Sequence, residues 1–300
     1  MSADQTSVAH AAELIRAGRL VAFPTETVYG LGANALDGAA VERIFIAKQR
    51  PRSSPMIVHV DSIEMAQTLA AEWPAAAEVL ARHYWPGPLT LVVRKRSVVP
   101  DIVTAGLATV GLRMPAHPLA IELIRAAQVP IAAPSANRFT ELSPTTAEDV
   151  PDELADFVLD GGPARVGIES TVVSLDGAPL LLRAGVIPLP EIESLIGPVA
   201  IAAAATQGPH ASPGMHPRHY RPATTLYLIA AGAPPPEGRG AWLRLGREMP
   251  ADPREYAAAL YRTLHRLDGE GLEWIAVECP PETPAWAGVL DRLRRAAAKR

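Results

Sequence analysis

Hydrophobic and polar positions alternate along this chain with two different spacings, and each spacing predicts one kind of element. Apolar residues three and four positions apart predict helices; they occur over residues 7–17, 38–48, 61–71 and 119–127. Short apolar runs bounded by turn residues predict strands; they occur over residues 20–23, 56–60, 89–93, 109–113, 130–133, 157–160, 170–175 and 179–183. Helices and strands alternate first and strands then cluster, which is typical of an α/β domain with a mixed sheet.

The pattern breaks at residues 198–222, which are rich in Ala, Pro, Gly and His and have no sustained periodicity. Such a composition predicts a long linker. Beyond it the same two spacings predict a small α/β unit; its strands are expected over residues 225–229, 241–245 and 274–277, and its helices over 252–267 and 286–298. We therefore expect a large domain at residues 1–197, a linker at 198–222 and a small domain at 223–300.

Composition narrows the class of protein. The chain has 300 residues, of which 48% are apolar, so it can bury a large core. Cys279 is the only cysteine, which excludes an intramolecular disulfide framework and a CxxC metal site. No apolar run reaches 18 residues and no signal-peptide core begins the chain, so we expect a cytoplasmic protein without a membrane span.

Candidate chemistry starts directly after the first predicted strand, where the sequence is PTETVYGLGANA. Thr25 and Thr27 offer hydroxyl groups, and Gly30 and Gly32 would let a ligand approach the backbone. The alternative is an ordinary glycine turn with a satisfied pair of threonines. No GxxxxGK[ST] motif occurs in the chain, which excludes a P-loop.

A basic cluster follows the second predicted helix and comprises Arg43, Lys48, Arg50 and Arg52. Guanidinium groups match the oxygens of phosphates and carboxylates in pairs, so this cluster can clamp a polyphosphate. The alternative is a solvated helix end, where cations are favoured by the helix dipole. His59 lies in the following strand, where either a structural or a catalytic role is open.

Arg113 lies in a predicted strand among apolar neighbours, where an unpaired charge is costly. Its partner must be a carboxylate, either of the protein or of a substrate. Ser135, Asn137 and Ser143 follow the strand of small residues at 130–133, where they could contact a ligand or close ordinary turns. Further polar candidates at strand ends are Ser170, Thr171 and Arg183.

No motif of a covalent nucleophile or a metal cluster accompanies these residues, since GxSxG and HExxH are both absent from the sequence. Oxygen donors, small residues and arginines at strand ends suit a catalyst that positions an anionic substrate and stabilises its charge. Nucleotidyl transfer is a reaction of this kind.

Taken in order, these segments resemble the threonylcarbamoyl-AMP synthase family, which is built on the YrdC-like domain. The matching segments cover residues 8–187 and read FPTETVYGLGANA, KQRP, PMIVHV, YWPGPLTLV, GLRMP, APSAN, ESTVV and RAG. SPGMHPRHYRP further resembles the linker of the family's long form. The resemblance implies an α/β fold, a YrdC-like domain with a twisted mixed β-sheet flanked by helices, followed by a linker that acts as a lid and a small Rossmann-like C-terminal α/β domain.

The same resemblance implies an L-threonylcarbamoyladenylate synthase, which condenses L-threonine, bicarbonate and ATP into threonylcarbamoyl-AMP and pyrophosphate. Downstream threonylcarbamoyl-transferase proteins would pass the group to an adenosine beside the tRNA anticodon, and direct tRNA binding is left open. Mg²⁺ would bridge the phosphates of ATP. We expect no metal ligated by the protein itself and no membrane partner.

Site residues also follow from the resemblance. The expected L-threonine contacts are Thr27, His59, Arg113, Ala133, Ser170 and Thr171. The expected ATP contacts are Lys48, Arg50, Ser54, Thr109, Ser135, Asn137, Ser143, Arg183 and Tyr220. Arg113 would pair with the threonine carboxylate, and Lys48 and Arg50 would act as catalytic residues by stabilising charge on the phosphates.

An RNA-binding module for tRNA or ribosome maturation is the alternative from another class. Residues 1–222 carry 17 basic and 22 acidic side chains, and aromatic residues make up only 5% of the chain, which disfavours RNA contacts and base stacking. A steep loss of RNA affinity with salt would identify such a module. A carbamoyl-phosphate-using enzyme of the same superfamily would need further domains that this chain does not contain.

Overall fold

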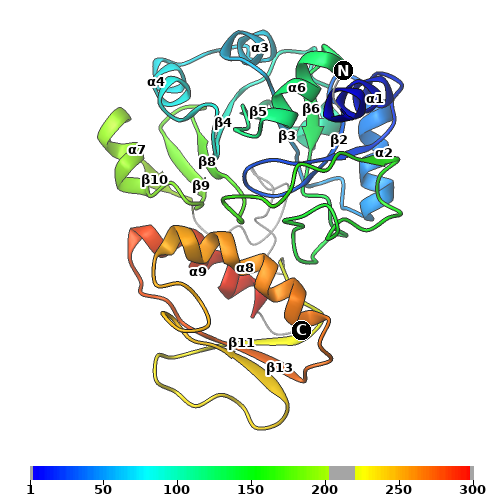
Figure 1. Ribbon diagram of the computed structural model, residues 1–300. Coiled ribbons are helices and arrows are strands. Elements are labelled where there is room, and N and C mark those ends of the chain that lie inside the picture. Colours follow the sequence, from blue (N-terminus) through cyan, green and yellow to red (C-terminus); the bar gives the residue numbers. More distant parts are fainter. Residues whose placement is uncertain (1–2, 203–219, 298–300) are drawn as a thin grey trace.

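Two sheets organise the chain in a computed structural model that describes residues 3–202 and 220–297 (Figure 1). The larger sheet has ten strands in the order β10-β9-β8-β4-β5-β3-β6-β2-β1-β7. Its strands are β1 (Val21–Phe23), β2 (Gly30–Asn34), β3 (Ile57–His59), β4 (Leu89–Arg94), β5 (Thr109–Arg113), β6 (Ile131–Ala133), β7 (Phe157–Val158), β8 (Thr171–Ser174), β9 (Leu180–Arg183) and β10 (Ala200–Ile201). Because β3 pairs in parallel with β5 and antiparallel with β6, the sheet is mixed, as the pattern predicts.

Helices accompany this sheet throughout the first unit. They are α1 (Ala3–Arg16), α2 (Gly38–Lys48), α3 (Ile63–Leu69), α4 (Ala75–Tyr84), α5 (Asp101–Thr104), α6 (Pro118–Ala127) and α7 (Leu189–Ile196). Asp37 caps α2 by accepting hydrogen bonds from the amides of Ala39 and Ala40. Helices α4, α5 and α7 were not predicted from the pattern. Each begins after a proline, at Pro74, Pro100 and Pro188, and none has a side-chain cap that would mark its start.

Strand β2 is a further difference, because its glycine-rich sequence predicts a turn. The structure explains Gly32 by packing: a Cβ atom there would lie 2.8 Å from both Ile131 and Phe23. Gly32 therefore serves close contact within the sheet rather than the approach of a ligand. Gly30 has a similar but looser environment, since a Cβ atom on it would lie 3.3 Å from Ala133, and it also faces the pocket described below.

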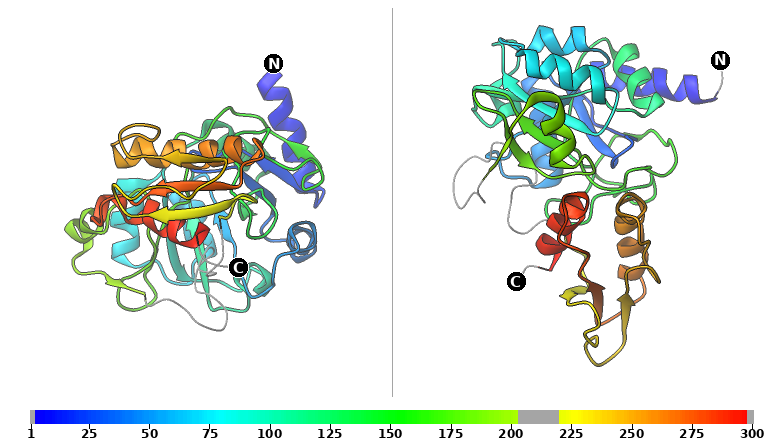
Figure 2. Two further views of the ribbon diagram at one scale, coloured as in Figure 1. Left: turned by 90° about the horizontal axis from the view of Figure 1, so that it is seen from below. Right: turned by 90° about the vertical axis from the view of Figure 1, so that its left-hand side faces the viewer.

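The smaller sheet is parallel and has the order β11-β13-β12. Its elements are β11 (Thr225–Ile229), β12 (Gly240–Leu243), α8 (Pro253–Asp268), β13 (Trp274–Glu278), a 3₁₀ turn (Pro284–Trp286) and α9 (Ala287–Ala296). Helices α8 and α9 lie between this sheet and the first unit (Figures 1 and 2). The prediction of a mixed-sheet α/β fold followed by a small α/β domain is confirmed.

One hydrophobic cluster joins the two units. Val28, Leu142 and Ile168 of the first unit pack in the same buried cluster as residues of α8 and α9. The C-terminal helices are therefore part of the surroundings of the polar segments singled out above. The predicted linker at 198–222 lies mostly outside the described residues, and its first part is strand β10, which pairs with β9. Within the described ranges, no helix has both the length and the apolar character needed to cross a bilayer.

Candidate active site

A pocket opens where β3, β5 and β6 end against the loop after β1 and the start of β8. Parallel strands β3 and β5 hold His59 and Arg113 in register at their carboxyl ends, the usual place for a ligand in an α/β sheet. The structure brings together many of the residues expected from the sequence. Those that line the pocket are Thr27, Arg50, His59, Arg113, Ala133, Ser135, Ser170, Arg183 and Tyr220.

Arg113 is buried at the pocket wall and has a carboxylate partner within the protein. Its Nη2 lies 2.7 Å from Oε1 of Glu26, and its Nη1 donates to the Thr27 hydroxyl at 3.0 Å. The amide of Ala116 donates to the other oxygen of Glu26 at 2.9 Å, so the carboxylate is held from two sides. Glu26 was not predicted, although it lies between the two threonines of PTETVYG. Its charge matches the buried arginine, and that was the available signal.

The loop that carries Glu26 is itself fixed by hydroxyl groups. Thr25 Oγ1 donates to the carbonyl of Val28 at 2.6 Å and lies 2.8 Å from Thr27 Oγ1. Tyr29 does not line the pocket, and its hydroxyl donates to the carbonyl of Gly162 at 2.8 Å. Thr27 is therefore the hydroxyl of this segment that meets Arg113, while Tyr29 ties the segment to the loop after β7.

His59 is buried beside Arg113, with its ring edge-to-face on Phe23 at 5.7 Å between centroids. Burial, and then the positive charge of Arg113, lower the pKa of His59 to about 3. The imidazole is therefore neutral at neutral pH. Its Nδ1 has no hydrogen-bond partner among the described residues, so it can make one contact with a bound molecule.

Lys48 and Arg50 bring buried positive charge to the edge of the pocket. Lys48 Nζ donates to the carbonyl of Ser135 at 2.7 Å and to the carbonyl of Asn137, and burial lowers its pKa well below the usual range. Arg50 donates to the carbonyl of Pro55 at 3.1 Å, and burial lowers its pKa to about 10. No carboxylate of the described chain forms an ion pair with either cation. Two buried cations without an anion make a site that favours a negatively charged ligand.

Arg183 also lines the pocket and is fixed on Ser170. Its Nε donates to the Ser170 carbonyl and its Nη2 to the Ser170 hydroxyl, both at 3.0 Å. The hydroxyl of Thr90 lies 2.7 Å from the same Ser170 oxygen. Burial lowers the pKa of Arg183. A guanidinium held in this way is ordered before any ligand arrives.

Three residues expected at the site lie elsewhere in its surroundings. Thr171 exchanges hydrogen bonds with the backbone of Ile187 through its hydroxyl, so it is occupied within the protein. Thr109 lines a smaller neighbouring cavity. Ser54 is buried in the turn after α2 but does not line the main pocket. Their roles stay predictions.

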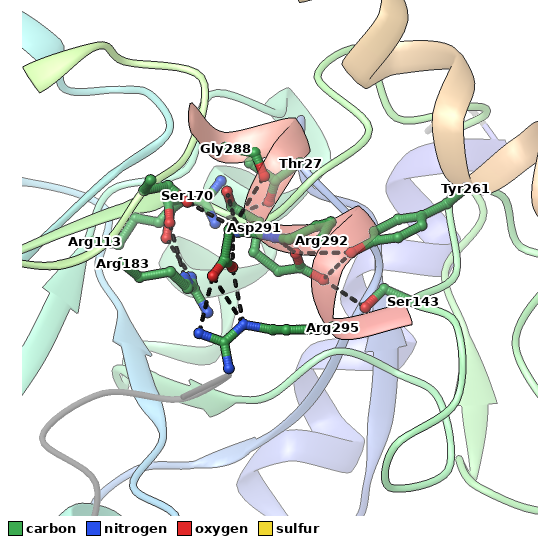
Figure 3. A network of polar contacts seen from close by, with 12 residues as sticks. Thr27, Arg113, Ser143, Ser170, Arg183, Tyr261, Gly288, Asp291, Arg292 and Arg295 are labelled. Atoms are coloured by element: carbon green, nitrogen blue, oxygen red, sulfur yellow. Dashed lines mark hydrogen bonds and ion pairs between the residues drawn. The ribbon is translucent and has the colours of Figure 1, made fainter. Parts of the chain in front are cut away.

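Asn137 and Ser143 also lie behind the pocket wall. Asn137 donates to the carbonyls of Arg138 and Glu141 and lines a second cavity between the two units. Ser143 donates to the carboxylate of Glu169 at 2.6 Å, and Glu169 does line the main pocket. Glu169 was missed by the sequence analysis, as were its partners Tyr261 and Arg292 in the C-terminal unit, which Figure 3 shows.

The fold and the pocket define a class of protein. Three buried arginines, a neutral histidine and several hydroxyls line an α/β pocket, and a buried lysine lies beside it. These features are typical of an enzyme that binds anionic substrates and acts by position and charge, as nucleotidyltransferases do.

Comparisons with known proteins agree with this class. The family model described as "Telomere recombination" matches residues 13–185, and the model described as "Threonylcarbamoyl-AMP synthase, C-terminal domain" matches residues 187–298. A threonylcarbamoyl-AMP synthase of Pyrococcus abyssi is 42% identical, covering 97% of this chain and 94% of the relative. One of Bacillus subtilis is 39% identical, covering 100% and 95%. The crystal structure of P. abyssi Sua5 complexed with L-threonine has a TM-score of 0.90 at 40% identity, covering 97% of this chain and 94% of that one.

The chain belongs to the threonylcarbamoyl-AMP synthase family. It is thus an enzyme of the nucleotidyltransferase type, and the resemblance to this family is confirmed. The match to the C-terminal domain model over residues 187–298 also confirms the resemblance to the family's long form. Membership favours the enzyme over the RNA-binding module considered above.

Proposed function

We propose that this chain condenses L-threonine, bicarbonate and ATP into threonylcarbamoyl-AMP and pyrophosphate. The observation that carries the proposal is that two buried arginines line one pocket. Arg113 lies at the strand ends, and Arg50 has no ion-pair partner among the described residues and lies near the buried Lys48. Arg113 suits an amino-acid carboxylate, and Lys48 and Arg50 suit a polyphosphate. The P. abyssi relative, which shares the fold, was crystallised with L-threonine.

Threonine would lie at the Arg113 end of the pocket. Arg113 has five N–H donors and uses only some of them on Glu26, Thr27 and Gly87, so a substrate carboxylate can join its partners. The neutral ring of His59 would supply one more contact through Nδ1. The other residues of this group would be Ala133, Ser170 and Thr171.

ATP would lie toward Lys48, Arg50 and Arg183, with the cations on its phosphates. The further contacts of this group would be Ser54, Thr109, Ser135, Asn137, Ser143 and Tyr220. Tyr220 directly follows the segment 203–219 in the sequence, and its buried ring lines the pocket. This position supports a contact with the nucleotide.

Mg²⁺ would enter with ATP and would neutralise charge on the phosphates. The chain itself offers little to hold it, because residues 3–202 and 220–297 contain no group of three or more His, Cys, Asp and Glu placed for a metal ion. Its ligands would therefore be phosphate oxygens and water, which is common for this ion.

The reaction would proceed in two steps. The threonine amine attacks bicarbonate, or the carbon dioxide formed from it, and gives a carbamate with loss of water or of a proton. A carbamate oxygen then attacks the α-phosphorus, the bond to the bridging oxygen breaks, and pyrophosphate leaves. Lys48 and Arg50 would stabilise the charge that develops on the phosphates. Exclusion of water matters because the mixed anhydride formed here is open to hydrolysis.

The product would pass to a threonylcarbamoyl transferase that modifies tRNA. A cytoplasmic location would suit that pathway and stays a prediction, as does any direct contact of this chain with tRNA.

Pyrophosphate release from ATP and bicarbonate, with and without L-threonine, tests the proposal. We expect release that depends on threonine, is lost in Arg113→Ala, and continues in Arg94→Ala, an exposed arginine that pairs with Asp176 at 2.8 Å. Arg113→Ala leaves Glu26 buried without its cation, which could disturb the whole pocket. The ATP affinity of this variant is therefore measured as well. Retained ATP affinity with retained threonine dependence in Arg113→Ala would contradict the assigned role of Arg113.

A further inference from the structure

Helix α9 of the C-terminal unit places one arginine directly behind the pocket wall, on the lining residue Glu169. Arg292 is fully buried, and its Nε donates to Oε2 of Glu169 at 2.9 Å (Figure 3). Its other nitrogens donate to the carbonyl of Glu169 at 3.2 Å and to the carbonyl of Ala184 at 2.6 Å. The guanidinium therefore holds both the side chain and the backbone of a residue that lines the pocket.

Helix α8 adds a second donor to the same carboxylate. The hydroxyl of Tyr261 donates to Oε2 of Glu169 at 3.2 Å, while the Ser143 hydroxyl donates to Oε1 at 2.6 Å (Figure 3). Glu169 is therefore fixed by three separate segments of the chain. Because Ser143 is bound to it, the position of that serine depends on the orientation of the Glu169 carboxylate.

Packing of α9 against the first unit supports the same arrangement independently of charge. A Cβ atom on Gly288 would lie 2.4 Å from the carbonyl oxygen of Gly185, and one on Gly185 would lie 2.4 Å from the amide of Thr171. No side chain fits between these backbones. Helix α9 thus presses on the segment just after Arg183, the arginine that is fixed on Ser170.

The aromatic ring of Tyr220 is a further contact between the pocket and the C-terminal helices. It lines the pocket, the Arg292 guanidinium lies 5.3 Å from its centroid, and the Tyr261 ring lies 5.9 Å from it. The two C-terminal helices therefore touch the pocket wall at Glu169, beside Arg183 and at Tyr220. An interface that only joined the two domains would not need contacts at all three of these positions of the pocket wall.

We propose that Arg292 and Tyr261 are positioning residues of the active site, which act through Glu169 to set the nucleotide end of the pocket. The C-terminal domain then supplies part of the active-site framework, although neither residue contacts the reacting atoms. The naming of the ligand as a nucleotide rests on the proposed function. The contacts themselves do not.

A tyrosine pair on one helix gives a matched test. Tyr261→Phe removes the hydroxyl that donates to Glu169. Tyr256→Phe removes a hydroxyl from the same helix, from a side chain that is equally buried, and its oxygen has no hydrogen-bond partner among the described residues. We expect Tyr261→Phe to raise the dissociation constant for ATP about threefold to tenfold, the range that corresponds to one ordinary hydrogen bond, because the carboxylate keeps its bonds to Ser143 and Arg292. Tyr256→Phe should leave it unchanged, and the threonine dissociation constant should change less than about twofold in both variants.

A second variant separates positioning from mere stability. Arg292→Met leaves Glu169 buried without its cation, so it should lower both the melting temperature and the ATP affinity. Adding Glu169→Leu removes the unpaired charge and should recover the melting temperature. The ATP affinity should stay at least about tenfold weakened, because Ser143 has lost its acceptor.

Three results would overturn the inference: equal ATP affinities in Tyr261→Phe and Tyr256→Phe, equal losses of ATP and threonine affinity in Tyr261→Phe, or full recovery of ATP affinity in the double variant. The unaltered protein distinguishes this failure from that of the proposed function. If it binds ATP and releases pyrophosphate with threonine while the variants behave alike, only the inference fails. If it does neither, the proposed function fails.

Discussion

Acidification provides a sharp test of the environment assigned to His59. Burial and the neighbouring charge of Arg113 lower the pKa of this side chain from 6.5 to about 3. Below pH 6.5 the unfolded chain binds a proton at this position, whereas the folded protein does so only near pH 3. The unfolded state therefore holds more protons in this window, and the free energy of unfolding falls as the pH falls.

The size of the effect follows from the shift. One pKa unit corresponds to about 1.4 kcal/mol. At pH 6.5 this histidine is already half protonated in the unfolded chain, so part of the effect is present at the start of the range. Between pH 6.5 and pH 4.5, His59 should therefore lower the unfolding free energy by about 2 kcal/mol. Replacing His59 with Asn removes the titrating group and keeps a polar amide near the position of Nδ1. The variant should lose about 2 kcal/mol less than the unaltered protein over the same range.

Urea unfolding at pH 7.5, 6.5, 5.5 and 4.5 measures this difference. His83→Asn is the control, because this histidine is exposed on α4. It should follow the unaltered protein at every pH. If His59→Asn lost as much stability on acidification as the unaltered protein did, the histidine would already be protonated in the folded state, and its assignment as a neutral pocket residue would be wrong.

Three further predictions concern separate features of the site. Arg50→Met should raise the dissociation constant for ATP at least about tenfold and leave the melting temperature equal or higher, because it removes a buried cation that has no ion-pair partner in the described chain. Isothermal titration measures the ATP affinity, and thermal melts measure the stability. Gly32→Ala should lower the unfolding free energy by about 1–3 kcal/mol, because its Cβ would press on Ile131 and Phe23. It should not selectively weaken the affinity for ATP or for threonine. Urea unfolding and ligand titration test this, and a loss of affinity confined to one ligand would show that Gly32 serves binding. Chelation of divalent ions should abolish pyrophosphate release but leave threonine affinity intact, and loss of threonine affinity in EDTA would contradict a metal held only by ATP.

The sequence predicted the sheet well where strands are short apolar runs. It misjudged β2, because glycines usually mark turns, and here Gly32 instead makes room for Phe23 and Ile131 in neighbouring strands. It also missed α4 and α7. Each begins after a proline without a side-chain cap, so the Ser, Thr, Asp or Asn that most clearly marks a helix start is absent.

The candidate site shows more clearly which features local sequence patterns cannot predict. Residues within the motifs could be found because strand ends and uncompensated charges mark them, as with Arg113. The partners of Glu169 could not be found in this way. Arg292 lies 123 positions away from it and Tyr261 lies 92 positions away, and each belongs to a helix whose apolar pattern explains its fold without any link to the site. Such pairings depend on how two domains dock, which no local pattern encodes.

Detection of the adenylate itself tests the central claim most directly. The protein is incubated with ATP, L-threonine, Mg²⁺ and ¹³C-labelled bicarbonate, and the products are analysed at once by mass spectrometry. The account predicts an adenylate that carries both the threonine and one labelled carbon, formed with pyrophosphate and absent when threonine is left out. Pyrophosphate or AMP formed without any labelled adenylate, under conditions in which added threonylcarbamoyl-AMP survives, would contradict it.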